Sequence, residues 1–423
     1  MTNKDTVKTE ISTNGPDHPY TALPDVPFSS NGIRLSPREA IVAAIIVAVL
    51  FVMIPKGWCL LEKFEPSADY RVPYDLSSDY WLYERYCRWA ADKYETVVIG
   101  DSVVWGHYVP PDNTLSQHLN RIVGSNEFAN LGVDGIHPVA LAGLIKYYSR
   151  SISGKNVILC FNPLWMTSRK HDLQTEKEFH FNHPRLAPQF LPKIPCYRET
   201  SSQKIGITLE RNLAFLSWAS HLQQISYDNL PPSLWSLEHP YDNIFHGAGI
   251  EASADLKTTA SESDTEFPQT SWRDRGLGRQ DFPWVELETS LQWRFFCEAV
   301  ETLQKRNNRV FIIVGPFNEH MMKGDSIQAY EEIKKGIGTW LRKNNIPHYL
   351  PPSLPSKNYA DASHPLSKGY ALLGEQLCRD ESFGRIILHR IDASVKSTLP
   401  PRFWSVAVVF AAFFGLLAVA SEL

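Results

Sequence analysis

Short apolar runs alternate with amphipathic stretches through the middle of this chain. Five runs rich in β-branched residues predict buried strands, at residues 96–99, 128–131, 156–161, 309–314 and 348–350. Helices are expected between and after them, at residues 115–123, 138–149, 209–225, 288–306, 327–343 and 366–377. Strands that alternate with helices predict an α/β fold, with a parallel sheet covered by helices on both faces.

This alternation is interrupted over residues 164–286, which we interpret as a long mid-chain insert. The segment is rich in proline, and its part 252–270 is rich in Ser, Thr, Asp and Glu. Such a composition is typical of a mobile loop. The sequence therefore predicts one domain over residues 62–398, with the insert inside it.

Two longer apolar runs lie at opposite ends of the chain. Ala40 to Ile54 contains only apolar residues, and a second run extends from Phe403 to Ala420. With their flanks they predict transmembrane helices at residues 37–61 and 402–421. For the first run the alternative is a signal-peptide core, but no small-residue cleavage site follows it.

The flanks of the first run suggest an orientation. Residues 1–36 are polar and without apolar periodicity, so we predict a disordered tail. Arg34 and Arg38 on the tail side favour a cytoplasmic N-terminus. A two-span chain then places the domain outside the cytoplasm, although Lys396 and Arg402 on the outer side of the second run weaken this assignment.

Composition excludes several classes of function. The 423 residues carry a formal net charge of −4, which gives no electrostatic footprint for nucleic acid. The six cysteines form no Cys-x-x-Cys pair, which argues against a cysteine-ligated metal. His180 and His183 have no further ligand at a known spacing, so neither a metal nor another cofactor is predicted.

The first candidate for chemistry is Ser102, in the sequence Gly100-Asp101-Ser102 that directly follows the first strand. Glycine permits a sharp turn from strand to helix. Ser102 would then lie at the carboxyl end of a parallel strand and at a helix N-terminus, where ligands bind and negative charge is stabilised. A nucleophile and a simple helix cap are both compatible with this position.

A second group of polar residues follows the last strand. Asp361 and His364 stand on one short loop, and could supply a general base with its orienting carboxylate. Oxyanion donors would come from neighbouring strand ends. The candidates there are the amide of Gly135 or Gly132 and the side chain of Asn162.

Other polar residues near these strand ends are expected to have structural roles or are compatible with more than one role. We expect Asp101 to cap the turn before the helix, and Trp105 to pack rather than line a pocket. Asn318, Glu319 and His320 follow the fourth strand, where contact with a substrate and ordinary loop polarity are equally compatible with the sequence.

In order and spacing these motifs resemble the SGNH (GDSL-type) hydrolase family. The motifs are Gly-Asp-Ser-x-x-x-Gly from Gly100, Asn-x-Gly-x-x-Gly from Asn130, Asn162, and Asp-x-x-His from Asp361. The resemblance implies a flavodoxin-like three-layer sandwich around five parallel strands. It also implies Ser102 as nucleophile, His364 as base and Asp361 as its orienter.

The resemblance further implies an oxyanion hole built from the amides of Ser102 and Gly135 and the side chain of Asn162. The third motif departs from the family, because Cys160-Phe161-Asn162-Pro163 stands where Gly-x-Asn-Asp is usual. Asn162 matches the motif, but its neighbours do not, so the resemblance does not predict the backbone conformation around Asn162.

The expected activity is that of a membrane-anchored serine esterase acting on acyl esters, such as acetyl groups on a cell-envelope glycan. Two alternatives stay open. One is transfer of the acyl group to an envelope polysaccharide, by the protein alone or beside a membrane-bound O-acyltransferase. The other is a non-catalytic envelope protein that keeps the fold for binding.

Overall fold

The computed structural model describes residues 35–62, 64–227, 229–241 and 269–388. The second expected membrane helix, nearly all of the expected tail and most of the expected loop 252–270 lie outside these ranges. The chain divides into two compact units, up to Phe51 and from Val52 onward. Helix α1, Pro37–Leu61, crosses that boundary, and within the described part of the chain it alone is long and apolar enough to span a membrane.

The second unit is built on a five-stranded parallel sheet, as the sequence predicts. The strands follow the spatial order β2-β1-β3-β4-β5, with β1 and β3 paired along most of their length. Their bounds are β1 Thr96–Gly100, β2 Phe128–Gly132, β3 Asn156–Phe161, β4 Arg309–Val314 and β5 His348–Tyr349. The expected bounds agree with these to within one residue.

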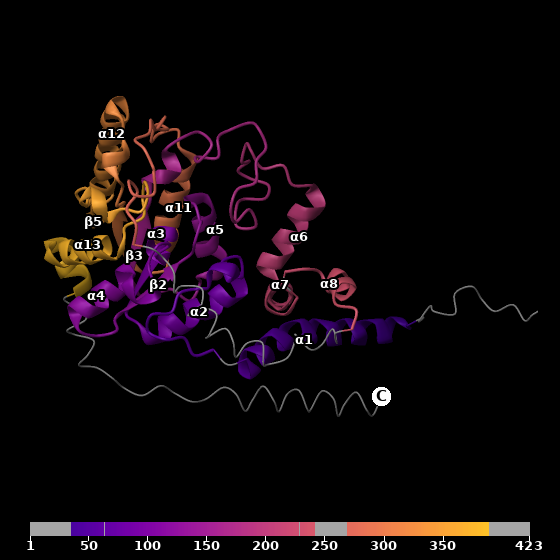
Figure 1. The fold of residues 1–423 in the computed structure, drawn as a ribbon. Coiled ribbons are helices and arrows are strands. Elements are labelled where there is room, and N and C mark those ends of the chain that lie inside the picture. Colours follow the sequence, from indigo (N-terminus) through magenta and orange to yellow (C-terminus); the bar gives the residue numbers. More distant parts are fainter. Residues whose placement is uncertain (1–34, 63, 228, 242–268, 389–423) are drawn as a thin grey trace, which may run out of the picture. The chain divides into compact units, whose positions relative to one another are not determined.

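Helices cover both faces of the sheet (Figure 1). One face carries α2 Tyr80–Lys93, α5 Pro138–Tyr148, α11 Leu291–Lys305 and α12 Gly324–Lys343. The other carries α4 Leu115–Val123, α13 Ser367–Arg379 and the short segments α14 Glu381–Phe383 and η7 Gly384–Leu388. The helices expected at these positions of the sheet are present, whereas α2 was not predicted because its closely spaced aromatic residues conceal a helical period.

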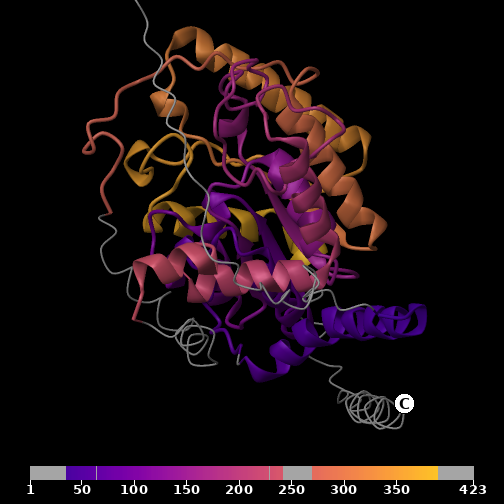
Figure 2. The ribbon, with the colours of Figure 1, turned by 90° about the vertical axis from the view of Figure 1, so that its right-hand side faces the viewer.

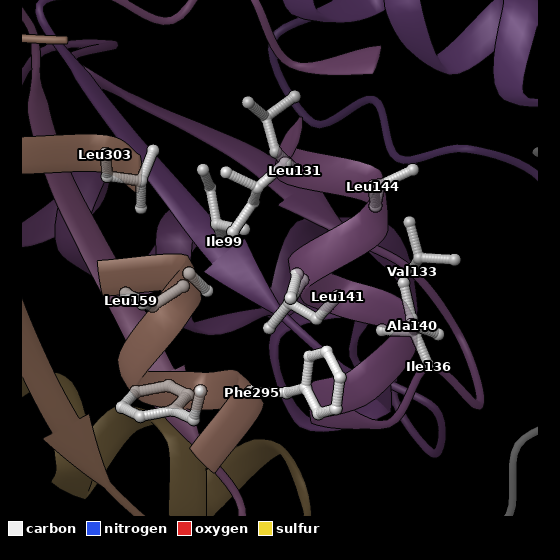
Figure 3. Packing of buried hydrophobic residues seen from close by; sticks show 14 of the residues in the cluster. Ile99, Leu131, Val133, Ile136, Ala140, Leu141, Leu144, Leu159, Phe295 and Leu303 are labelled. Carbon is white, nitrogen blue, oxygen red and sulfur yellow. The ribbon is translucent and has the colours of Figure 1, made fainter. Parts of the chain in front are cut away.

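Alternation along the strands divides the core in two. Ile99 of β1 points into the layer of α5 and α11 and belongs to the same cluster as Leu141 and Phe295 (Figure 3). Its neighbour Val98 belongs to the opposite cluster, with Leu119 of α4 and residues of α13. Because both faces are buried, each strand is a nearly continuous apolar run rather than an alternating one.

The insert carries three helices of its own, α6 Ser201–Asn212, α7 Ala214–Ser226 and α8 Pro232–Glu238. They lie to one side of the sheet, nearest the viewer in Figure 2. The expected single helix over 209–225 is wrong. Leu213 has an extended backbone that separates α6 from α7, and α6 starts earlier, at a capping box formed by Thr200 and Gln203.

A buried group of ionisable side chains joins α7 to the chain after α1. His221 of α7 lies 2.5 Å from Asp79 and 3.0 Å from Glu62, and Glu62 is also paired with Arg85 of α2. All four side chains are buried. Removing one partner of such a group leaves a buried charge uncompensated, so the group fixes α7 against α2.

Candidate active site

Ser102 is separated from the end of β1 by Asp101 alone and is the first residue of the short helix α3, Ser102–Trp105. Asp101 caps this helix by accepting a hydrogen bond from the amide of Val103. Gly100 is required here, because a Cβ at this position would lie 2.5 Å from a methyl carbon of Val104. The turn therefore brings the serine to the carboxyl edge of the sheet.

The second half of the site is a tight loop ahead of α13. The backbone of this loop closes through a bridge between Tyr359 and Pro365 and a 2.9 Å hydrogen bond from the Ala360 amide to the His364 carbonyl. Inside it, one carboxylate oxygen of Asp361 accepts from the amides of Ser363 and His364, each at 2.9 Å. The loop thereby holds Asp361 and His364 side by side.

These two segments meet in one hydrogen-bonded array. His364 Nε2 lies 2.8 Å from Ser102 Oγ, and His364 Nδ1 lies 2.8 Å and 2.9 Å from the two carboxylate oxygens of Asp361. A carboxylate can only accept, so Nδ1 carries the proton and Nε2 is free to accept from the serine hydroxyl. The side chains are largely withdrawn from water, with Ser102 7% and His364 8% exposed.

The electrostatics of the array follow from burial and from the neighbouring charges. Burial opposes ionisation of Asp361, but the adjacent His364 and the hydrogen bonds of the loop hold its pKa well below the usual range. Burial alone would lower the pKa of His364. The carboxylates of Asp361, Asp101 and Asp134 outweigh it, and the pKa is raised above 6.5.

The structure separates the two glycine candidates for an oxyanion donor. The amide of Gly132 donates to the side chain of Asn130 at 2.9 Å and is therefore occupied. Neither Ser102 nor Gly135 uses its backbone amide in a hydrogen bond to another described residue. Gly135 has a φ of +66°, in the left-handed region that favours glycine.

Asn162 is tied to the nucleophile turn through Asp101. Its Nδ2 donates to Asp101 Oδ2 at 2.7 Å, and Trp165 Nε1 donates to the same oxygen at 2.9 Å. Asn162 Oδ1 accepts from the Leu164 amide and so starts a single 3₁₀ turn, Pro163–Met166. The backbone after Asn162, which the resemblance does not predict, is therefore this 3₁₀ turn.

Asp101 thus does more than cap α3. Burial raises its pKa, against the hydrogen bonds from Trp165 and Asn162 and the charge of His364. The carboxylate accepts from three donors on two segments, and it aligns the end of β3 with the end of β1. The cap was predicted from sequence, whereas the bridge to Asn162 was not.

The remaining polar candidates make contacts within the protein. Asn318 is fully buried and supports the loop of Asp361, donating through its side chain to the Asp361 carbonyl at 2.9 Å. Glu319 pairs with Lys334 at 2.8 Å, and His320 lies 3.0 Å from the Leu354 carbonyl. Asn318 therefore helps to hold the backbone of Asp361 in place.

Trp105 is buried, as the packing interpretation predicts. The guanidinium of Arg71 lies 3.7 Å from the centre of the Trp105 ring, and its Nη1 donates to the carbonyls of Trp105 and Gly106. This contact fixes the end of α3. His183 is also engaged, lying 2.9 Å from the Asp134 carbonyl and 3.0 Å from the Tyr80 hydroxyl.

No three His, Cys, Asp or Glu side chains converge as metal ligands among the described residues. All six cysteines fall in the described ranges, and each is a free thiol.

Sequence reasoning missed a second histidine–carboxylate pair beside the array. His107 Nδ1 lies 2.6 Å from Asp134 Oδ1, and the ring centres of His107 and His364 are 5.4 Å apart. Tyr108 is also next to His364, at 5.4 Å between ring centres, and Arg275 lies over its ring. Asp134 stands within the Asn-x-Gly-x-x-Gly motif, but nothing in the sequence pairs it with His107.

Residues of the insert form hydrogen bonds with the loops that surround the array. Asn182 donates to the Gly135 carbonyl at 3.3 Å, and its own carbonyl lies 3.0 Å from His137 Nε2. Farther along, Gln269 joins the Tyr108 carbonyl to the amide of Ser367. The insert therefore holds the loops that follow β1 and β2.

Comparison with models of known protein families, and with curated protein sequences, finds no match to this chain. The resemblance to the SGNH hydrolases therefore rests on the four short motifs and on the arrangement of their residues.

Proposed function

We propose that this protein is a membrane-anchored serine hydrolase of the SGNH type that acts on acyl esters. The observation that carries the proposal is the continuous array from Ser102 through His364 to Asp361, assembled from segments 262 residues apart. The serine, base and carboxylate each have the partner that nucleophilic catalysis requires.

In the proposed reaction Ser102 Oγ attacks the ester carbonyl while His364 Nε2 takes the hydroxyl proton. Asp361 keeps Nδ1 protonated and stabilises the imidazolium. The amides of Ser102 and Gly135 and the side chain of Asn162 receive the negative oxygen of the tetrahedral intermediate. When the intermediate collapses, His364 returns the proton to the departing alcohol. Water then cleaves the acyl-enzyme, again with His364 as base.

The strand order also favours this assignment. The order 2-1-3-4-5 is that of flavodoxin-like sheets, whose ligands bind outside the carboxyl ends of the strands. Ser102 follows β1, Gly135 follows β2 and Asn162 follows β3, so all three lie at that edge. We therefore propose the flavodoxin-like three-layer sandwich of the SGNH fold.

Helix α1 supports the membrane location, and the proposal adds a second span at residues 402–421 and a domain outside the cytoplasm. Acyl esters of the cell envelope are the substrates that such a domain could reach. Protease access to loop 252–270 tests the orientation. Cleavage that requires opening of the cytoplasmic side would overturn the outward placement.

The nucleophile is tested by labelling the full chain with a fluorophosphonate probe. Label is expected in the native protein and in Ser153→Ala, an exposed serine ahead of β3, and is expected to disappear in Ser102→Ala. If the native protein labels no better than Ser102→Ala, the serine is not activated and the non-catalytic alternative holds.

Hydrolysis and transfer are separated by a panel of short-chain acyl esters, assayed with and without oligosaccharide acceptors. Release of free acid at the same rate in both conditions identifies an esterase. Appearance of acylated oligosaccharide at the expense of free acid identifies the transferase alternative, since the acyl-enzyme is common to both.

A further inference from the structure

The pair of His107 and Asp134 lies beside the proposed catalytic array but has no part in it. The His107 side chain is 31% exposed, and that of Asp134 is 13% exposed. Nδ1 of the imidazole faces the carboxylate at 2.6 Å. In the neutral imidazole the proton is therefore on Nδ1, and Nε2, on the opposite edge of the ring, can accept a hydrogen bond from an external hydroxyl.

This acceptor is close enough to serve the same substrate. The ring centres of His107 and His364 are 5.4 Å apart, so the two imidazoles lie side by side at the same edge of the sheet. Asp134 is near enough for its charge to raise the pKa of His364. A substrate bonded to Ser102 would therefore have its next polar group within reach of His107.

The surroundings of the pair combine an apolar surface with hydrogen-bond donors. Tyr74 is 54% exposed, and its ring centre lies 6.2 Å from that of His107. Arg275 is exposed and lies 4.4 Å from the centre of the Tyr108 ring. An aromatic face beside an acceptor and a five-donor guanidinium matches a polyhydroxylated ring, whose C–H faces are apolar and whose rim is polar.

We infer that His107 and Asp134, with Tyr74 and Arg275, form a subsite for the alcohol portion of the ester, and that this portion is a carbohydrate. His107 Nε2 accepts a hydrogen bond from the hydroxyl next to the esterified oxygen. The inference rests on the proposed function, since it places the ester carbonyl at Ser102. It names the substrate class that the catalytic array leaves open.

The test compares two substrates that differ in one hydroxyl. One is a methyl glucoside carrying a single acetyl group, and the other lacks the hydroxyl beside that acetyl group. The native protein should prefer the first by about tenfold in kcat/KM, the value of one hydrogen bond. In His107→Phe, which keeps a ring but has no acceptor, the ratio should fall to about one.

Two further variants make the result specific. His107→Gln places an amide near the position of Nε2 and should recover part of the preference. His348→Phe, at the opposite end of the sheet, should keep the full ratio. The subsite is overturned if His107→Phe retains the tenfold ratio, or if the native protein shows none.

Binding to Ser102→Ala separates failure of the subsite from failure of the proposed function. Saturation-transfer NMR would compare methyl glucoside with its deoxy form on this variant. A preference that is lost on adding His107→Phe supports the subsite even if Ser102 is not the nucleophile. Equal binding of the two sugars overturns the subsite even if the fluorophosphonate labels Ser102.

Discussion

Asp101→Asn is the substitution for which the structure gives the clearest expectation. The carboxylate is buried and receives three donors, with the Val103 amide on one oxygen and the Asn162 and Trp165 side chains on the other. An asparagine has one oxygen, so in either orientation at least one donor faces an amide N–H₂. The substitution therefore leaves a buried donor unsatisfied.

The magnitude follows from that donor. A buried unsatisfied donor costs about 1–3 kcal/mol. Because burial raises the pKa of Asp101, loss of the charge itself adds little to this cost. We expect a loss of about 2 kcal/mol, seen as a fall in Tm of about 2–4 °C for the full chain in detergent, because the unfolding entropy of so long a chain is large.

Activity provides a second readout of the same variant. The Asp101 carboxylate contributes to the raised pKa of His364, so the acid limb of kcat/KM should move to lower pH in Asp101→Asn. Asp172→Asn is the matched control. Asp172, in the insert, is equally buried and accepts from Ser290, Leu291 and Gln292, none of which belongs to the array.

The control should lose comparable stability without a shift of the pH profile. The reasoning is refuted if Asp101→Asn has a Tm within about 1 °C of the native protein, since one unsatisfied donor should cost more. If the pH profile of kcat/KM shifts as much in Asp172→Asn as in Asp101→Asn, the charge of Asp101 is not what raises the pKa of His364.

Because the pKa of His364 is raised, its neutral, basic form is populated only at higher pH. The value of kcat/KM should therefore rise with pH through an acid limb above 6.5. An acid limb below 6.5 in the pH–rate profile would contradict this expectation. Asn162→Ala should lower turnover by about 10²–10³-fold if the side chain holds the oxyanion, and an unchanged kcat would reject that role. Gly135→Ala should reduce both Tm and kcat, because φ is +66° and the added Cβ would lie 2.5 Å from Asn182 Nδ2. Its control is Gly154→Ala, where φ is also positive but nothing lies within 4 Å, so strain alone is measured; equal effects on kcat would show that the clash is irrelevant.

The sequence by itself determined the sheet and its helices where each element has a strong local signal. The run from Asn156 to Phe161 is apolar, β-branched and followed by a proline, so its strand was predicted at its observed bounds. The helix Leu115–Val123 was likewise predicted at its observed bounds. The break at Leu213 was not predicted, because no glycine or proline marks it and contacts of the two helices with different neighbours fix their directions.

The motifs also indicated which residues meet at the site, because the carboxyl ends of parallel strands share one edge. Ser102, His364 and Asp361 were named from their order along the chain, and the structure brings them within hydrogen-bond distance. The family resemblance already favours Gly135 over Gly132 as an oxyanion donor, and the tertiary structure adds that the amide of Gly132 has a partner in Asn130.

The tertiary structure alone also joined residues that no local pattern relates. Asp101, after β1, accepts hydrogen bonds from Asn162 and Trp165, after the neighbouring strand β3. His107, in the loop after α3, contacts Asp134, in the loop after β2. Side-chain hydrogen bonds between segments depend on how the loops are packed, and here the insert packs them. Hydrophobic periodicity predicts which face of an element is buried, but it does not predict which polar side chains of different segments come into contact.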